Sequence, residues 1–223
     1  ALPKENVLVK ITKTFKGYAT ADLLEIKVPS PNRTTPFCPY FTKCGGCSLQ
    51  HIDYKAQGEL KRELLMESIT RYTKLNPRSF EVKPTILMDN PNNYRAKVSL
   101  PIKNGIHGTV FGLYAPNSEK FIRIKNCGVQ NEQINNIMEE VTKALDKLAI
   151  TAFDGKSKKG HVRYVVCRSS VYSKEVQVTF ILAKELKNIS ELANELMKNK
   201  AIVSVYYSVN NDTDDVSIFG DNL

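Results

Sequence analysis

Apolar residues recur at intervals of three and four along residues 130–148, and this pattern predicts an amphipathic helix. Its stripe consists of Ile134, Ile137, Met138, Val141, Leu145 and Leu148. A second helix is predicted over about residues 54–73, with Asp53 as its N-cap. The apolar face of this helix is predicted to consist of Ala56, Leu60, Leu64, Leu65, Ile69 and Tyr72. We expect each helix to bury its apolar face.

Short apolar and alternating runs predict strands in two parts of the chain. Near the beginning, residues 7–11 and 18–28 flank the turn Lys16-Gly17 and predict a hairpin. Later predicted strands cover residues 94–102, 108–114, 119–125, 161–168, 175–182, 201–208 and 215–219. From residue 94 onward we therefore expect an α+β domain with a largely antiparallel sheet and helices.

Two local signals place a turn and a third helix in this domain. Lys103-Asn104-Gly105 predicts the hairpin turn after the strand at 94–102. Asn188 and Glu191 resemble a capping box and predict a helix over about residues 189–199.

The predicted elements divide the chain into three parts. An isolated two-stranded hairpin is not stable in water, so within residues 1–37 we expect the hairpin either to pack on another element or to be the remnant of a larger β-domain, followed by a polar linker. Residues 38–93 combine a cysteine-rich loop with the helix that follows it. Residues 94–223 form the central α+β domain.

Composition and charge narrow the class of protein. The chain has 223 residues, 42% of them hydrophobic and 25% charged, as in ordinary globular proteins. We expect a cytoplasmic monomer with no membrane association, because no apolar run reaches about 18 residues and no signal-peptide pattern is present. The net charge of +9 is uneven: residues 1–128 contain 20 Lys and Arg against 10 Asp and Glu, and residues 129–223 contain 12 against 13. This asymmetry is what a polyanion partner such as nucleic acid would require, and a solvated lysine-rich surface would give the same charge pattern equally well.

Three of the five cysteines lie within ten residues, in Cys38-Pro-Tyr-Phe-Thr-Lys-Cys44-Gly-Gly-Cys47, and Cys127 follows a predicted strand meander. Short spacers with glycines bring several thiolates to one point, and clustered cysteines in a reducing compartment typically bind metal. Four thiolates suit tetrahedral zinc or a cubane iron–sulfur cluster. The arrangement of three plus one favours the cluster, because structural zinc usually draws on two CxxC-like pairs.

The remaining reactive residue types offer no catalytic constellation. Cys167 lies in the middle of a predicted strand and is expected to be a small buried hydrophobe. His51, His107 and His161 show no metal-ligand spacing, and His51 is expected to hydrogen-bond around the cysteine loop. No glycine-rich phosphate loop follows a strand, so the chain shows no nucleotide-cofactor site.

Basic residues on predicted strands offer a surface for RNA. Arg95 and Lys97 are two residues apart and share one face of a regular strand, whereas Arg163 and Arg168 are five apart and face opposite ways. With Tyr94 these side chains suit phosphate binding and base stacking, although solvated or ion-paired charges would give the same pattern.

The residues around the cysteines resemble those of the RNA (uracil-5-)-methyltransferases, which methylate C5 of a uridine in tRNA or rRNA with S-adenosylmethionine. The resemblance rests on Arg33-Thr-Thr-Pro-Phe-Cys38-Pro-Tyr-Phe-Thr-Lys-Cys44-Gly-Gly-Cys47-Ser-Leu-Gln50-His51 and on the later cysteine. The runs Asn93-Tyr94-Arg95-x-Lys97, Phe111-Gly-Leu-Tyr114 and Gly160-His-Val-Arg163 also match, so that the resemblance covers about residues 7–220.

This resemblance implies a [4Fe-4S] cluster and an RNA-binding central domain. The ligands that it implies are Cys38, Cys44, Cys47 and Cys127, and the RNA-binding residues are Arg95, Lys97 and Arg163. Residues 7–28 resemble the last strands of a TRAM domain, a small RNA-binding β-barrel. The S-adenosylmethionine-binding catalytic domain of the family follows the segment matched here, and no residue of this chain matches its nucleophilic cysteine or its base.

The sequence therefore predicts the iron–sulfur and RNA-recognition portion of an RNA (uracil-5-)-methyltransferase, inactive by itself. Two alternatives stay open: an iron–sulfur redox or electron-transfer module, and a zinc-dependent RNA-binding protein.

Overall fold

The computed structural model describes residues 1–211 and 218–220. The chain forms two compact units. The first unit contains residues 1–41 and 47–89, and the second contains residues 42–46 and the chain from residue 90 onward. No helix in the described part of the chain is both long and apolar enough to span a membrane.

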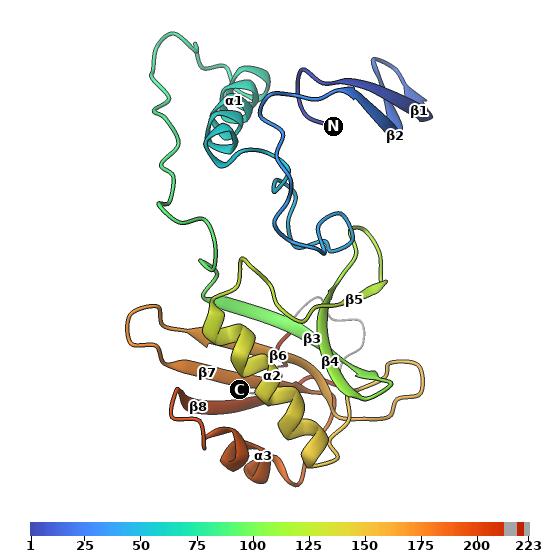
Figure 1. Cartoon of the computed structure of the whole chain (residues 1–223), viewed down its shortest axis with the longest axis vertical. Coiled ribbons are helices and arrows are strands. Elements are labelled where there is room, and N and C mark those ends of the chain that lie inside the picture. Colours follow the sequence, from blue (N-terminus) through green and yellow to red (C-terminus); the bar gives the residue numbers. More distant parts are fainter. Residues whose placement is uncertain (212–217, 221–223) are drawn as a thin grey trace. The chain divides into compact units, whose positions relative to one another are not determined.

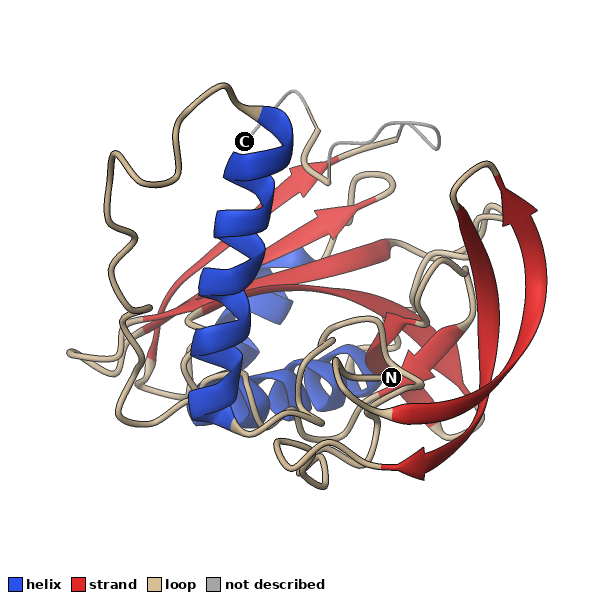
Figure 2. Ribbon diagram, turned by 90° about the horizontal axis from the view of Figure 1, so that it is seen from above, coloured by secondary structure: helices blue, strands red, loops and turns tan. Residues whose placement is uncertain are grey.

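The first unit begins with the predicted hairpin. Strands β1 (Asn6–Phe15) and β2 (Tyr18–Val28) pair antiparallel around Gly17, whose φ of 99° requires a residue without a Cβ. The first strand is longer than predicted, and the two strands curve together as one ribbon (Figure 2). Nearly every side chain of the hairpin is exposed. The small core of this unit lies elsewhere, around Leu2, Ile52 and Ala56.

An ion pair fixes the linker that follows the hairpin. The Glu5 carboxylate accepts hydrogen bonds from Arg33 Nε at 2.5 Å and from Arg33 Nη2 at 2.9 Å. The backbone N–H groups of Leu2 and Ser30 also donate to it, at 2.6 and 3.2 Å. The Glu5 side chain is fully enclosed. The guanidinium and the two backbone donors lower the pKa of this carboxyl from 4.5 to about 2.

Helix α1 (Tyr54–Tyr72) matches its predicted range, and the Asp53 side chain accepts from the backbone N–H groups of Lys55 and Ala56 as an N-cap does. The prediction of a buried apolar face was wrong for most of the helix. Leu64, Leu65 and Tyr72 are 52%, 51% and 82% exposed. Within this unit the extended segment 85–88 contacts the first turns of α1, whereas these three later positions stay exposed among the described residues.

The second unit is built on a mixed six-stranded sheet with the order β5-β4-β3-β6-β7-β8 (Figure 1). Its strands are β3 (Lys97–Gly105), β4 (Gly108–Tyr114), β5 (Phe121–Arg123), β6 (Val162–Ser169), β7 (Val176–Leu182) and β8 (Ile202–Val209). All neighbouring strands pair antiparallel except β7 and β8, which are parallel because helix α3 (Ile189–Leu196) crosses over between them. The predicted α+β class and its largely antiparallel sheet are confirmed.

Helices α2 (Glu132–Lys147) and α3 (Ile189–Leu196) cover one face of this sheet, which is the near face in Figure 1. The predicted stripe of α2 is the centre of the core: Ile134, Ile137, Met138, Val141 and Leu145 are all no more than 2% exposed. These side chains pack against alternate residues of the strands, such as Leu100 and Phe180.

Three of the elements predicted for this part of the chain differ from the structure or lie partly outside the described residues. Lys103, Asn104 and Gly105 belong to β3, and the turn is the dipeptide Ile106-His107 because Gly105 pairs with Gly108. Asn188 makes no side-chain cap hydrogen bond, so the predicted capping box is wrong, and α3 ends three residues early. Most of the strand predicted at 215–219 lies outside the described residues, and its last two residues do not form a strand.

Candidate cysteine-rich site and RNA interface

The cysteine-rich segment contains turns and no regular secondary structure. In the first unit, the backbone N–H of Cys38 donates to Oε1 of Gln50 at 3.3 Å, and the N–H of Phe41 donates to the carbonyl of Cys38 at 3.1 Å. These contacts give Gln50, a residue of the motif quoted above, a defined role. It fixes the backbone of the first cysteine.

Cys44 belongs to the second unit together with the two glycines that follow it. Its Sγ is buried and accepts the backbone N–H of Gly46 at 3.3 Å. The N–H of Gly45 donates to the carbonyl of Tyr114 at the end of β4, at 2.9 Å. A Cβ on Gly45 would lie 3.0 Å from that carbonyl oxygen, and one on Gly46 would lie 3.2 Å from Leu113. The glycines therefore allow the loop to approach β4 closely.

Cys127 is fixed by a buried side chain of α2. The Oδ1 of Asn135 accepts the backbone N–H of Cys127 at 3.1 Å, and its Nδ2 donates to the carbonyl of Cys127 at 3.1 Å. Asn135 is only 5% exposed. Sequence reasoning missed this residue, although an asparagine beside the apolar stripe of a helix was a signal, because a buried amide needs polar partners.

The four candidate ligands are divided evenly between the units: Cys38 and Cys47 lie in the first, and Cys44 and Cys127 in the second. Within residues 1–211 and 218–220, no group of three or more His, Cys, Asp or Glu side chains is arranged to hold a metal ion. The chemistry of the donors still fits an iron–sulfur cluster. All four donors are cysteine sulfurs, the ligands that such clusters take, and the N–H group directed at Cys44 Sγ is of the kind that stabilises a cluster-bound thiolate.

His51 lies beside the same loop. Its carbonyl accepts the backbone N–H of Thr34 at 3.0 Å, and its ring lies 5.4 Å from that of Phe41. The Nδ1 atom is buried and has no hydrogen-bond partner among the described residues. Burial and the nearby Arg33 cation lower the pKa of His51, so the neutral imidazole is favoured.

The predicted RNA-binding residues have different environments. Lys97 is the first residue of β3 and is exposed. Arg95 precedes β3 and forms an isolated bridge with Gln130, with its backbone N–H donating to the carbonyl of Val129 at 2.8 Å. Arg163 lies at an irregularity of β6 and donates from Nη1 to the carbonyl of Asn210 at 2.8 Å.

The guanidinium of Arg163 also lies 5.9 Å from the centre of the Phe153 ring. These contacts give Arg163 a structural role in joining three segments. Of the predicted RNA-binding residues, Lys97 therefore has the most open surroundings.

Cys167 is confirmed as a buried residue of the core. Its side chain is fully buried, and its Sγ lies 3.5 Å from the Met138 sulfur. Burial raises the pKa of this thiol to about 12. Such a thiol is not available as a nucleophile at neutral pH.

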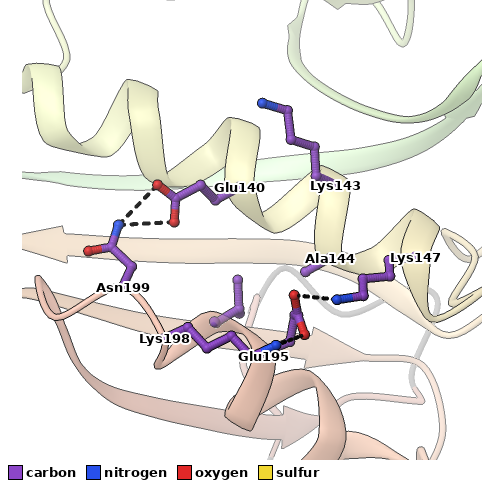
Figure 3. Close-up of a pocket in the computed structure, with 8 residues that line it drawn as sticks. Glu140, Lys143, Ala144, Lys147, Glu195, Lys198 and Asn199 are labelled. Atoms are coloured by element: carbon purple, nitrogen blue, oxygen red, sulfur yellow. Dashed lines mark hydrogen bonds and ion pairs between the residues drawn. The ribbon is translucent and has the colours of Figure 1, made fainter.

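A charged pocket between α2 and α3 is explained by pairing among its own residues (Figure 3). Glu195 accepts from Lys147 Nζ at 2.8 Å and from Lys198 Nζ at 2.6 Å. Asn199 Nδ2 donates to both carboxylate oxygens of Glu140, at 3.0 and 2.9 Å. The two lysines lower the pKa of Glu195. We therefore assign these groups to the joint between the helices.

Several bacterial proteins are similar to almost the whole chain. No family model matches it. A Bacillus anthracis protein named as an uncharacterized RNA methyltransferase is 37% identical over 223 residues, which is 99% of this chain and 48% of that protein. A Clostridium tetani protein of the same name is 34% identical over 218 residues, covering 97% of this chain and 47% of its own length.

A solved structure supports the fold. It is the tRNA (uracil-54, C5)-methyltransferase of Pyrococcus abyssi in complex with S-adenosyl-L-homocysteine. The match has a TM-score of 0.68 at 24% identity and covers all of this chain and 48% of that one. The chain is thus similar over almost its whole length to proteins named as RNA methyltransferases, and it spans about half of their length.

Proposed function

We propose that this chain is the RNA-recognition part of an S-adenosylmethionine-dependent RNA (uracil-5-)-methyltransferase. The observation that supports this most strongly is the similarity of almost the whole chain to half of several RNA methyltransferases. The fold shared with a tRNA uracil-C5 methyltransferase and the excess of basic residues before residue 129 point the same way. The substrate is a uridine in tRNA or rRNA.

We assign the methyl-transfer chemistry to the half of the relatives that this chain does not match. Uracil methylation at C5 needs a nucleophile that adds to the ring and makes C5 reactive. No described residue suits that role, because the buried Cys167 thiol is held in its neutral form. We therefore expect the chain alone to bind RNA and not to methylate it, as a monomer in the cytoplasm.

We further propose that Cys38, Cys44, Cys47 and Cys127 hold a [4Fe-4S] cluster. Support comes from the cysteine spacing, the Gly46 N–H directed at Cys44 Sγ and the fixed backbone of Cys127. When bound, the group would supply structural cross-linking through four iron–thiolate bonds. The residues of the chain position the thiols: Gln50 fixes Cys38, and Asn135 fixes Cys127.

Anaerobic purification tests the cluster and separates the alternatives. The account predicts brown protein with about four iron and four sulfide per chain. Cys127→Ser should lose most of this content, whereas Cys167→Ala, which changes a cysteine of the core, should keep it. Colourless protein with stoichiometric zinc would favour the zinc-dependent RNA-binding protein. Reversible reduction at a physiological potential would favour the redox module.

The enzymatic assignment is tested in the source organism. Inactivating the gene should remove 5-methyluridine from one position of tRNA or rRNA, as measured by mass spectrometry of RNA fragments. Reintroducing the gene should restore the modification. Unchanged 5-methyluridine at every position, with loss of a different methylated nucleoside, would contradict the uracil-5 assignment. The broader assignment as an RNA methyltransferase would remain.

A further inference from the structure

Two basic residues face each other on neighbouring strands of the second unit. Lys97 of β3 and Arg168 of β6 are direct partners in the antiparallel register. The backbone N–H of Ser169 donates to the carbonyl of Ala96 at 2.8 Å, which makes that adjacent pair a hydrogen-bonded one. Lys97 and Arg168 therefore form a non-hydrogen-bonded pair, the position at which opposing side chains lie closest.

The pair lies on the sheet face that α2 and α3 do not cover. The next residues along the strands, Val98 and Cys167, also face each other, and both belong to the core beneath the helices. Because side chains alternate between the faces of a strand, Lys97 and Arg168 must point to the opposite face. Sequence reasoning could not pair them, since the register of the two strands was unknown.

Two like charges directly opposite each other destabilise a sheet. Both side chains are exposed, and neither forms an ion pair within the described part of the chain. An anion placed between them would remove the repulsion and would accept hydrogen bonds from the planar Arg168 fork and from the Lys97 ammonium. A phosphodiester group has this chemistry.

The same face continues with groups that suit a nucleotide chain. Gln177 of β7 pairs with Arg168, and Ser204 of β8 pairs with Gln177, which extends the row with an amide and a hydroxyl. Tyr206, two residues beyond Ser204 on β8, points to the same side and is 54% exposed. The row crosses three strand spacings, or about 14 Å, from β3 to β8.

We propose that this row binds an unpaired strand of the RNA substrate. We call Lys97, Arg168, Gln177, Ser204 and Tyr206 the open-face row. Lys97 and Arg168 share one phosphate, Gln177 and Ser204 hydrogen-bond to the next nucleotide, and the Tyr206 ring stacks on a base. An acidic protein segment would use the two cations but not the exposed aromatic ring. The inference rests on the proposed function, because that function makes RNA the partner.

Fluorescence anisotropy with a labelled single-stranded RNA, on the full 223-residue chain purified anaerobically, tests the inference. Lys97→Ala and Arg168→Ala should each weaken binding. Each should also reduce by about one the number of counterions released on binding, as measured by the slope of log affinity against log salt concentration. If both contact the same phosphate, the double variant should lose less than the product of the two single losses. Tyr206→Ala should weaken binding about tenfold without changing the salt dependence.

The controls distinguish binding from folding. Lys143→Ala removes an exposed lysine of α2, on the other side of the sheet, and should leave binding unchanged. Lys97→Glu should form an opposite-charge pair with Arg168, raising the urea midpoint while weakening RNA binding more than Lys97→Ala does.

Each outcome decides between clear alternatives. If the wild-type chain binds RNA and substitutions of Lys97, Arg168 and Tyr206 have no effect, the open-face row is not the RNA-binding site. The proposed function would still stand. No RNA binding by the wild-type chain would overturn both. The Lys97 and Arg168 variants could lose binding while polyglutamate displaces the labelled RNA from the wild-type chain as well as unlabelled RNA does. This result would show a general anion-binding patch and would contradict recognition of RNA.

Discussion

Asn135 holds the backbone of Cys127 through both ends of its amide, with Oδ1 accepting from the Cys127 N–H and Nδ2 donating to the Cys127 carbonyl, each at 3.1 Å. The asparagine is buried in α2, the helix whose apolar stripe fills the core. The position of a proposed cluster ligand is therefore tied to the helix at the centre of the second unit's core. This connection explains how a cysteine 80 residues after Cys47 is held in a defined place.

Replacing Asn135 by alanine should destabilise the second unit and reduce cluster retention. The substitution leaves the N–H of Cys127 without its partner, which costs about 1–3 kcal/mol for a buried group left unsatisfied. It also removes one of two hydrogen bonds to the Cys127 carbonyl, which still accepts from the backbone N–H of Gln130 at 3.1 Å. Urea unfolding and iron content per chain measure the two effects. The matched control is Asn136→Ala, because Asn136 is the exposed neighbour on the same helix. Equal iron content and stability in both variants would contradict the role of Asn135.

The buried thiol of Cys167 should resist alkylation in the folded, metal-free protein. Its raised pKa of about 12, against an ordinary value of 9.0, leaves almost no thiolate near neutral pH, and its side chain is not accessible. Peptide mass spectrometry after brief alkylation should find Cys38 and Cys127 modified and Cys167 intact. Labelling of Cys167 at the rate of Cys38 would show that the core is open.

The same thiol should reduce stability at alkaline pH. The unfolded chain ionises Cys167 above about pH 9, while the folded chain keeps it neutral until about pH 12. The stability contributed by the neutral thiol is therefore complete below pH 9 and is lost as pH rises through this range. Cys167→Ala should show a flatter decline of unfolding free energy above pH 9 than the wild type.

Much of the fold followed from local patterns. The stripe beginning at Ile134 predicted α2, because a long 3.6-residue repeat is hard to reconcile with any other element. The burial of α1 was predicted wrongly, since periodicity shows which face is apolar but not whether another element covers it. The turn at Ile106-His107 was missed because Asn104-Gly105, a typical turn dipeptide, is here part of a strand.

The contacts of the candidate site depended on tertiary structure. Spacing alone predicted the four cysteines as metal ligands. Their binding to one common cluster stays a proposal. The bond from Asn135 to Cys127 and the pairing of Lys97 with Arg168 both require the packing of a helix or the register of two strands. Neither relationship is encoded in the spacing of neighbouring residues.

The Glu5–Arg33 ion pair should make the first unit sensitive to acid. The folded pKa of Glu5 is about 2, against an ordinary value of 4.5. The pair therefore stabilises the fold fully above about pH 4.5, and this contribution is lost as pH falls toward 2. Hydrogen exchange of residues 28–34 in Glu5→Gln should be faster at pH 6 and should change less on acidification than in wild type. Glu25→Gln is the control, since Glu25 forms only an exposed pair with Lys27.

Gly112 should be intolerant of any side chain. A Cβ at this position would lie 2.1 Å from the carbonyl oxygen of Ile122 in the neighbouring strand, which is backbone and cannot move away alone. Gly112→Ala is expected to cost about 1–3 kcal/mol or more, because β4 and β5 must separate. Gly155→Ala, in open space with no atom within 4 Å of the added Cβ, should change the unfolding free energy little. Equal stabilities would contradict this packing of β4 against β5.

The most direct test of the central claim is the affinity of the anaerobically purified chain for a structured uridine-containing RNA, measured over a series of salt concentrations. If the chain is the RNA-recognition part of the enzyme, the dissociation constant should rise steeply with salt, because lysines and arginines that bind phosphates release counterions. Absence of binding, or an affinity that does not change with salt, would contradict the account.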